Sequence, residues 1–361
     1  MKLEPKIDEK VISKCETLYQ KIKKDAPCIS ATSGSHVWDE KPPWFDELKF
    51  KQGQQVAAKY FASIFLSHTI GLTILFNIPT MITPLAATRT HASVSKLFIR
   101  YLAVFIHVKK WYESDPYEKG SAGYKSLRTV NTFHKRVGND MNKNVIEPGK
   151  NPVWISQYDM AVTVWCVIAP IIMNPAKVGI HGITRGEVES LMHVWACIGR
   201  LLGVEDRYNI MTGTYDEAYY LCTIIKDREY KPVIDSLTFP ASVGFETCKG
   251  IAIGLQPIAP FVSLQGFMRY WYTIFDFKVD VPVASPWAER TGFFLLHFIL
   301  RLPFGQYFFA LLVKYFLQYC DKNRTTIASK LEKLYPDDVL PYISPDTFQP
   351  AQLLSHSVSS P

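Results

Sequence analysis

Apolar residues recur at intervals of three and four along most of this 361-residue chain, which is the spacing of helices that bury one face. The pattern is clearest over 184–203. Its apolar face holds Val188, Leu191, Met192, Trp195, Ile198 and Leu202. Thr184 and Glu187 have the spacing of a capping box at its start, and Gly203 stands where a left-handed cap would end it.

The same spacing predicts an all-α fold. An amphipathic helix is expected over about 8–24, and further helices near 52–77, 92–112, 123–142, 153–173, 184–203, 213–228, 232–253, 258–277, 286–301 and 304–334. Only 277–282 alternates as a strand would, and neither Asn-Gly nor Asp-Gly occurs to turn a hairpin.

No Gly/Ser linker, charge block or internal repeat divides the chain, so one large helical domain is the simplest organisation. We expect residues 1–50 to form an N-terminal helix and a polar approach segment. The helical domain would cover 51–335, and 336–361 would be a flexible tail. Hydrophobic residues make up 48% of the chain, enough for a large core.

The formal net charge of +7 comes from scattered lysines and arginines, without any nucleic-acid-binding motif. We therefore expect no nucleic-acid partner, although attraction to an anionic membrane surface fits the charge. The seven cysteines form no Cys-x-x-Cys pair, and the charged N-terminus does not resemble a secretory signal. These features favour an intracellular, reducing location, either cytosolic or against a membrane such as the endoplasmic reticulum.

The segment 60–88 carries no Asp, Glu, Lys or Arg and is long enough to cross a bilayer. His68, Asn77 and Pro79 within it are more typical of a core helix in a large bundle. A membrane span and a buried helix both remain open at this point.

Common catalytic motifs are absent, including the P-loop, the dinucleotide-binding turn, the nucleophile elbow and the His-Glu-x-x-His zinc helix. Glu187, Glu189 and His193 could place metal ligands on one helix. The bundles that bind two iron ions repeat such a set on a second helix, and this chain has no second copy. Structural or solvated roles are therefore favoured for these three residues.

His134 lies on a helix whose apolar face includes Val130, Phe133 and Val137, so its ring should point inward. Periodicity allows two interpretations. The imidazole is either a hydrogen-bonded core group or an axial ligand to haem iron, a role that needs a neutral nitrogen in a dry pocket. His68, His107 and His297 also lie in apolar stretches and are alternative ligands.

Several short pieces occur in an order that resembles the rubber oxygenase family, which includes bacterial latex-clearing protein. It also includes the fungal endoplasmic-reticulum oxygenase that shortens a farnesyl chain in mycophenolic acid biosynthesis. The resemblance covers about 44–305. The pieces are Gly53-Gln54, Arg100-Tyr101, Val130-x-x-x-His134, Trp154-x-x-Gln157-Tyr-Asp159, Gly182-Ile-Thr-x-x-Glu187 and Trp195-x-x-x-Gly199-x-Leu-Leu-Gly203-Val.

The resemblance implies a globin-like helical bundle that holds haem b and uses dioxygen to attack a double bond of an isoprenoid. His134 resembles the family's proximal haem ligand, and so would be the metal ligand. Arg100 resembles the arginine near the haem, where it could pair with a propionate or polarise bound oxygen as a cofactor-binding and catalytic residue.

The chain departs from the family on the distal side of the haem. Ala103 and Val104 stand at the positions of a lysine and a threonine, and Asn131 stands where an arginine often precedes the histidine. Pro84 and Leu85 stand near the expected place of a glutamate base.

The sequence leaves three functions open. The first is a haem-dependent oxygenase of an apolar isoprenoid or lipid. The second is a non-catalytic haem or lipid carrier on the same fold, and the third is an integral membrane protein without a cofactor. Gln157 and Asp159 could contact a propionate, but capping and buried hydrogen bonds are favoured for them.

Overall fold

The structure is a computed structural model that describes residues 3–32, 38, 40–88, 92–145, 147–237, 243–257, 264–279, 286–302, 305–336 and 349–351. Within these ranges all regular elements are helical, and the only β-type pairings are the isolated bridges Ser30–Ser156 and Pro148–Asn151. The all-α prediction is confirmed. The division at residues 50 and 335 stays a prediction, and most of 336–361 lies outside the described ranges.

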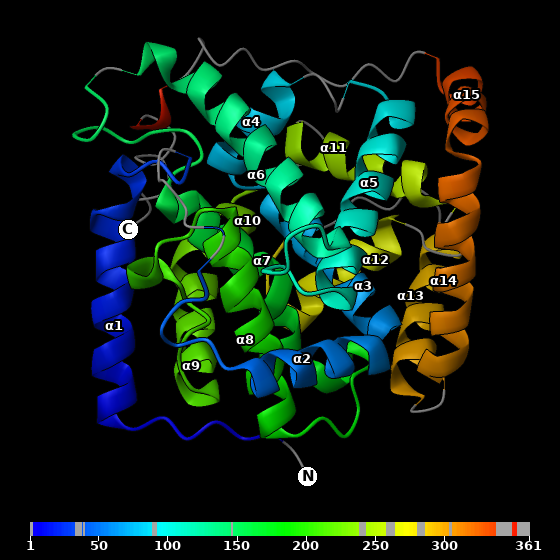
Figure 1. Cartoon of the computed structure of the whole chain (residues 1–361). Coiled ribbons are helices and arrows are strands. Elements are labelled where there is room, and N and C mark those ends of the chain that lie inside the picture. The colour runs from blue at the N-terminus through cyan, green and yellow to red at the C-terminus, as the bar shows by residue number, and fades with distance from the viewer. Residues whose placement is uncertain are drawn as a thin grey trace.

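Fifteen α-helices are described, and Figure 1 labels them in chain order. Their bounds are α1 Glu9–Lys24, α2 Glu47–Lys59, α3 Phe61–Leu75, α4 Pro79–Ala87, α5 Val94–Glu113, α6 Ala122–Met141, α7 Gln157–Met173, α8 Arg185–Leu202, α9 Tyr215–Ile225, α10 Lys231–Asp235, α11 Val243–Leu255, α12 Leu264–Phe275, α13 Pro286–Arg301, α14 Gly305–Lys322 and α15 Arg324–Leu334. A π-helical segment, Lys226–Tyr230, joins α9 to α10.

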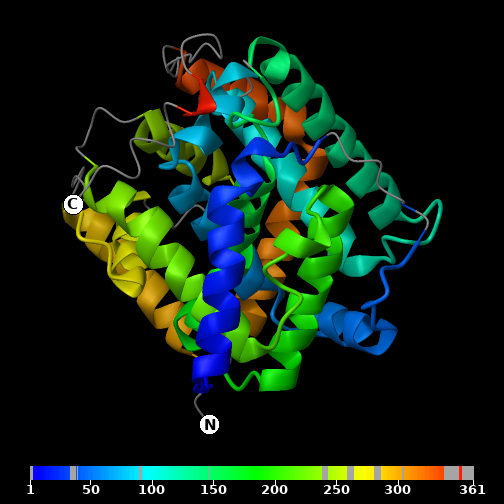
Figure 2. The same ribbon diagram turned by 90° about the vertical axis from the view of Figure 1, so that its left-hand side faces the viewer.

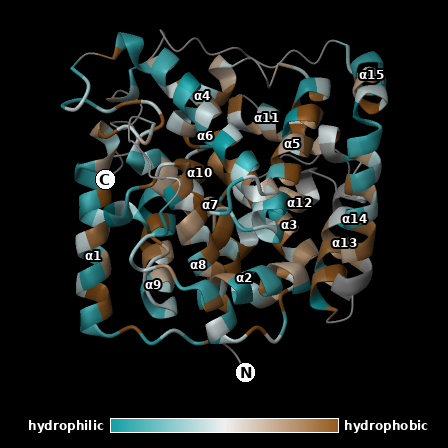
Figure 3. Cartoon of the chain, in the orientation of Figure 1, coloured by the Kyte–Doolittle hydropathy of each residue, from teal (hydrophilic) through white to brown (hydrophobic). Residues whose placement is uncertain are grey.

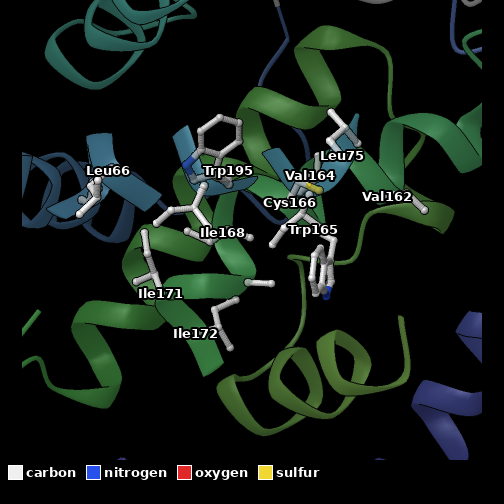
Figure 4. Close-up of a cluster of buried hydrophobic side chains, with 14 of the residues drawn as sticks. Leu66, Leu75, Val162, Val164, Trp165, Cys166, Ile168, Ile171, Ile172 and Trp195 are labelled. Carbon is white, nitrogen blue, oxygen red and sulfur yellow. The ribbon is translucent and has the colours of Figure 1, made fainter. Parts of the chain in front are cut away.

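Helices α3 and α7 form the centre of the core, and both are apolar nearly all round. Figure 4 shows the side chains where they meet, with Leu66 and Leu75 from α3 and Trp165, Cys166 and Ile168 from α7. Figure 3 shows that the hydrophilic residues gather on the outer helices. This is expected, because burying apolar surface in the core is favourable.

The helix caps formed as the sequence predicts. The Thr184 side chain accepts from the backbone N–H of Glu187, whose carboxylate accepts from the N–H of Thr184. Gly203 ends α8 with φ +121°, a conformation that favours glycine. Ser156 and Asp159 form a matching capping box on α7, which confirms the structural interpretation of Asp159.

Two predicted helices are each broken by a residue outside the helical conformation. The predicted helix 52–77 is two helices, α2 and α3, which meet at Tyr60 with a bend of 91°. Tyr60 has φ −109° and ψ 29°, and its hydroxyl donates to the carbonyl of His181, which fixes the corner. The predicted helix 304–334 is likewise divided at Asn323 into α14 and α15.

The structure also bears on the membrane span and the strand. No single helix in the described ranges is long and apolar enough to cross a bilayer; the bent pair α2–α3 could do so by length and composition alone. Phe277, Lys278 and Val279 have no regular structure, and the remainder of the predicted strand lies outside the described residues.

The N-terminal helix packs against the body of the protein. Figures 1 and 2 show α1 alongside α9, and the two helices are in contact. Asp8 caps α1 by accepting from the N–H of Val11. At its other end, Tyr19 and Lys23 donate to the buried carboxylate of Glu229 in the π-helical segment. These contacts hold the end of α1 against the π-helical segment that follows α9.

Candidate functional site

Helix α5 places a row of side chains along one wall of an internal cavity. Arg100, Val104, His107 and Trp111 are spaced by three or four residues and share one face of this helix. All four line the cavity, whose volume is about 290 Å³. Ser93 caps the start of α5 by accepting from the N–H of Lys96, so the row begins on a fixed first turn.

The cavity is mainly apolar, and helices α3, α4, α6, α7 and α8 supply its other walls. Polar groups enter at a few points only. They include Thr80, Thr88, Arg100, His107, His134 and Asp159. A second hollow of about 690 Å³ adjoins it and shares Arg100, His107 and His134 in its wall. Both volumes lie near the range of small-molecule sites.

His134 is half-buried in this wall, and its buried Nδ1 atom has no hydrogen-bond partner among the described residues. Burial, together with the positive charge of Arg100, lowers the pKa of His134 to about 4. The imidazole is therefore neutral at pH 7. A neutral ring with an unpartnered nitrogen in a mainly apolar cavity has the chemistry that an iron ligand requires.

Arg100 brings a positive charge into the same apolar wall. Its Nη1 lies 3.5 Å from the hydroxyl of Thr88, and its guanidinium lies 6.0 Å from the ring centre of Phe133. Burial lowers the pKa of Arg100, but an arginine remains charged at neutral pH. The site can thus attract an anionic group such as a carboxylate.

His107 is held in one orientation by Ser126 and Trp111. Its Nδ1 lies 2.6 Å from the Ser126 hydroxyl oxygen, which also accepts from Nε1 of Trp111 at 2.8 Å. The indole can only donate, so the serine proton is free for Nδ1 of His107. This arrangement favours the His107 tautomer with its proton on Nε2, as a donor on a cavity-lining ring.

Four of the five positions at which the chain departs from the family pattern lie at this site. Pro84, Leu85 and Val104 line the cavity, and Ala103 lines the adjoining hollow. Asn131 does not line either space; it is buried and donates to the carbonyl of Leu201.

Two of the alternative histidine ligands lie elsewhere, since neither His68 nor His297 lines the cavity or the hollow. His68 hydrogen-bonds through Nε2 to Tyr112 at 3.0 Å and through Nδ1 to the Val167 carbonyl at 3.1 Å. His68 is thus a hydrogen-bonded core histidine, the role that periodicity also allowed for His134. His134 itself has no such partner at Nδ1 among the described residues.

One prediction about the face of α6 is wrong. Phe133 was expected on the apolar interior face, but its side chain is 40% exposed. It lies at the wall that the cavity and the adjoining hollow share, between Arg100 and the surface. The side of α6 that faces the cavity carries Val130 and His134, and Phe133 covers the edge of the site.

Gln157 and Asp159 serve mainly in buried hydrogen bonds, as predicted. Gln157 donates to the carbonyl of Gly203 and accepts from the N–H of Glu205, which ties α7 to the end of α8. Asp159 also lines the cavity. Burial raises the pKa of its carboxyl group to about 6 although Ser156 hydrogen-bonds to it.

Glu187, Glu189 and His193 do not form a metal site. Glu187 caps α8 and pairs with Lys59, Glu189 accepts from the N–H of Tyr215, and Nε2 of His193 accepts from the N–H of Asp46. No group of three or more potential ligands that could hold a metal lies among the described residues. Their structural interpretation is confirmed.

Sequence reasoning missed Thr80, Met81 and Trp111 as parts of the cavity wall. Trp111 could have been found, because it continues the row of Arg100, Val104 and His107 on one helical face. Thr80 and Met81 carry no such signal, since their place depends on the short helix α4 and on how it packs.

Comparison with known proteins identifies the fold. No protein-family model and no curated protein matches the chain. Among solved structures, latex clearing protein in its closed state aligns with 85% of this chain and 86% of its own, at a TM-score of 0.53 and 15% sequence identity. At this identity the likeness establishes the fold. The chain therefore has the fold of latex clearing protein.

Proposed function

We propose that the protein is a haem-dependent oxygenase that uses dioxygen to oxidise an apolar isoprenoid or lipid. The observation that carries the proposal is His134, a neutral imidazole whose buried Nδ1 lacks a partner among the described residues. It lies in a mainly apolar cavity whose lining also includes Arg100 and a second histidine, His107. The likeness to latex clearing protein supports the same proposal.

A ring nitrogen of His134 would hold the iron of haem b. Ligation needs the neutral imidazole, and burial beside Arg100 keeps it neutral over the physiological pH range. When bound, haem would supply the iron centre at which dioxygen is activated. The apolar wall around it would exclude water and so protect reactive species from side reactions.

Arg100 and His107 would provide the polar contacts of the site. The guanidinium of Arg100 would pair with a haem propionate or donate a charge-assisted hydrogen bond that polarises dioxygen. The Nε2–H of His107 would donate into the same space. With Ala103 and Val104 apolar, these two residues would carry the tasks that a lysine and a threonine share in the family.

An apolar substrate fits the remaining wall, which is largely aliphatic and aromatic. Such substrates reside in or against membranes, so we place the protein at an intracellular membrane, such as the endoplasmic reticulum, or in the cytosol. The seven cysteines are all free, and six of them are buried, which suits a reducing compartment.

The first test is the absorption spectrum of the full chain, expressed with haem supplementation and recorded oxidised and reduced. We expect a stoichiometric Soret band that is lost in His134→Ala. His297→Ala is the matched control, because its Nδ1 is also buried without a described partner but it does not line the cavity. Circular dichroism would confirm that both variants fold. A Soret band that persists in folded His134→Ala would rule out this residue as the ligand.

A non-catalytic haem or lipid carrier is the second candidate, favoured by the apolar Ala103 and Val104 in the site wall. The two functions differ in turnover. An oxygenase consumes dioxygen when a polyisoprenoid is added to the haem-loaded protein, whereas a carrier binds the ligand without consuming dioxygen.

A further inference from the structure

Large apolar side chains are exposed on one part of the molecule. Of the twelve that are exposed among the described residues, seven belong to α13, α14 and the residue directly after α13. They are Trp287, Phe294, Phe298, Leu302, Leu311, Tyr315 and Tyr319. We call this set the aromatic ridge. Single exposed apolar residues are normal in proteins, but a concentration of this kind marks an interaction surface.

The aromatic ridge exists because α13 and α14 each carry apolar residues on two faces. On α13 the inward face buries Leu296 and Leu300, while Trp287, Phe294 and Phe298 follow one another at helical spacing on the outside. Trp287 is 84% exposed, Phe294 67% and Phe298 63%. Packing among the described residues accounts for the first face only.

Helix α14 repeats the arrangement. Val313 and Leu317 are buried against the body of the protein, whereas Leu311, Tyr315 and Tyr319 point outward. The two helices are in contact, and Figure 1 shows both on the same side of the molecule, at the right of the view. The ridge is therefore spread over both helices.

Basic residues border the ridge. Segment 286–334 contains seven Lys or Arg residues against three Asp or Glu residues, a net charge of +4. Among them Arg290, Arg301, Lys314 and Lys322 are exposed on α13 and α14. A surface of this charge is complementary to anionic phospholipid headgroups.

A groove runs along the outer side of α13. Its volume is about 580 Å³, and its described lining is Trp287, Arg290, Thr291, Phe294, Leu295 and Phe298. An apolar floor with one guanidinium at its side suits a lipid, whose acyl chain would lie on the aromatic rings while its phosphate meets Arg290.

We propose that the aromatic ridge binds the surface of an anionic phospholipid membrane, with α13 and α14 lying on the bilayer. Trp and Tyr are the residues that favour the boundary between headgroups and acyl chains, and both occur on the ridge beside Phe and Leu. The inference goes beyond the proposed oxygenase activity and does not depend on haem, because none of the ridge residues lines the cavity.

The test is flotation of the purified full chain with phosphatidylcholine vesicles that contain 30% phosphatidylserine, and with vesicles of phosphatidylcholine alone. We expect binding to the anionic vesicles. The double variant Phe294→Ser/Phe298→Ser should weaken that binding at least tenfold. Leu48→Ser is the control, because Leu48 is an 81% exposed apolar residue on α2, and this variant should bind like the unaltered chain.

A charge variant tests the headgroup contribution separately. Arg290→Glu/Lys322→Glu should reduce binding to the anionic vesicles and have little effect on the weaker binding to neutral ones. Failure of the unaltered chain to float with anionic vesicles would overturn the proposal. So would a dimer, seen by sedimentation, that Phe294→Ser/Phe298→Ser dissociates, because the ridge would then join two copies. The Soret measurement is independent of either outcome.

Discussion

A Cβ atom placed on Gly71 would lie 1.9 Å from the backbone carbonyl oxygen of Cys166. Helices α3 and α7 thus approach each other closely enough that only hydrogen fits between them at this point. The approach sets how α3 packs on α7, and α7 carries Asp159 and other cavity residues. Gly71 itself does not line the cavity.

Replacing Gly71 with Ala should lower the free energy of unfolding by at least about 2 kcal/mol, because the contacted atom belongs to the backbone and cannot move aside. Urea denaturation followed by circular dichroism would measure this. Gly186→Ala, on the exposed start of α8, has nothing within 4 Å of its added Cβ and should cause no loss. Equal stability of the two variants would contradict the close approach.

Glu229 is buried and accepts hydrogen bonds from Tyr19 and Tyr158, each at 2.5 Å, and from Lys23 at 2.7 Å. Glu229→Ala would leave these three donors without their acceptor, and we expect a loss of about 3 kcal/mol in the free energy of unfolding. Glu205→Ala removes an exposed pair with Arg207 and should cost less than about 1 kcal/mol. If both variants lose the same small amount, the buried cluster does not stabilise the fold.

The Ser126 hydroxyl is hydrogen-bonded to two side chains of the cavity wall, at Nδ1 of His107 and at Nε1 of Trp111. Ser126→Ala leaves the buried indole N–H of Trp111 without an acceptor, so we expect a loss of about 1–3 kcal/mol in the free energy of unfolding. It also frees the His107 ring to change tautomer. Nitrogen-15 NMR of the histidine rings would show the proton of His107 on Nε2 in the unaltered chain and mixed in the variant. Thr129→Ala, an exposed hydroxyl on the same helix, is the control.

Local signals predicted the caps and most of the helices, because their causes lie within a few residues. The predicted capping box at Thr184 needs only side chains three positions apart, and Gly203 needs only its own backbone freedom. The corner at Tyr60 has a distant cause, its hydrogen bond to the carbonyl of His181. No periodicity in 52–77 could reveal that partner.

The candidate site was predictable in part for the same reason. The face shared by Arg100, Val104 and His107 follows from helical spacing, and the family resemblance singled out His134. That His134 and Arg100 line the same cavity depends on how α5 packs on α6, which the sequence alone does not specify. The outward position of Phe133 depends on the same packing.

His68 makes the stability of the protein depend on pH. Burial lowers its pKa to about 4 in the folded chain, against an ordinary value near 6.5. Below pH 6.5 the unfolded chain therefore binds a proton at His68 that the folded chain does not bind, so stability falls as pH falls. Asp159 acts in the opposite sense, because its raised pKa, about 6, lets the folded chain keep a proton that the unfolded chain releases.

Comparison with His68→Gln isolates the histidine, because Asp159 and the other titrating groups are present in both proteins. For a shift from 6.5 to about 4, moving from pH 7.5 to 5.5 costs the unaltered chain about 1.4 kcal/mol through His68 alone. Urea unfolding at the two pH values should show that the variant, although less stable at pH 7.5, loses less on acidification by this amount. The same loss in both proteins would mean that His68 is not held neutral by the core, and that its bonds to Tyr112 and Val167 tolerate the charged ring.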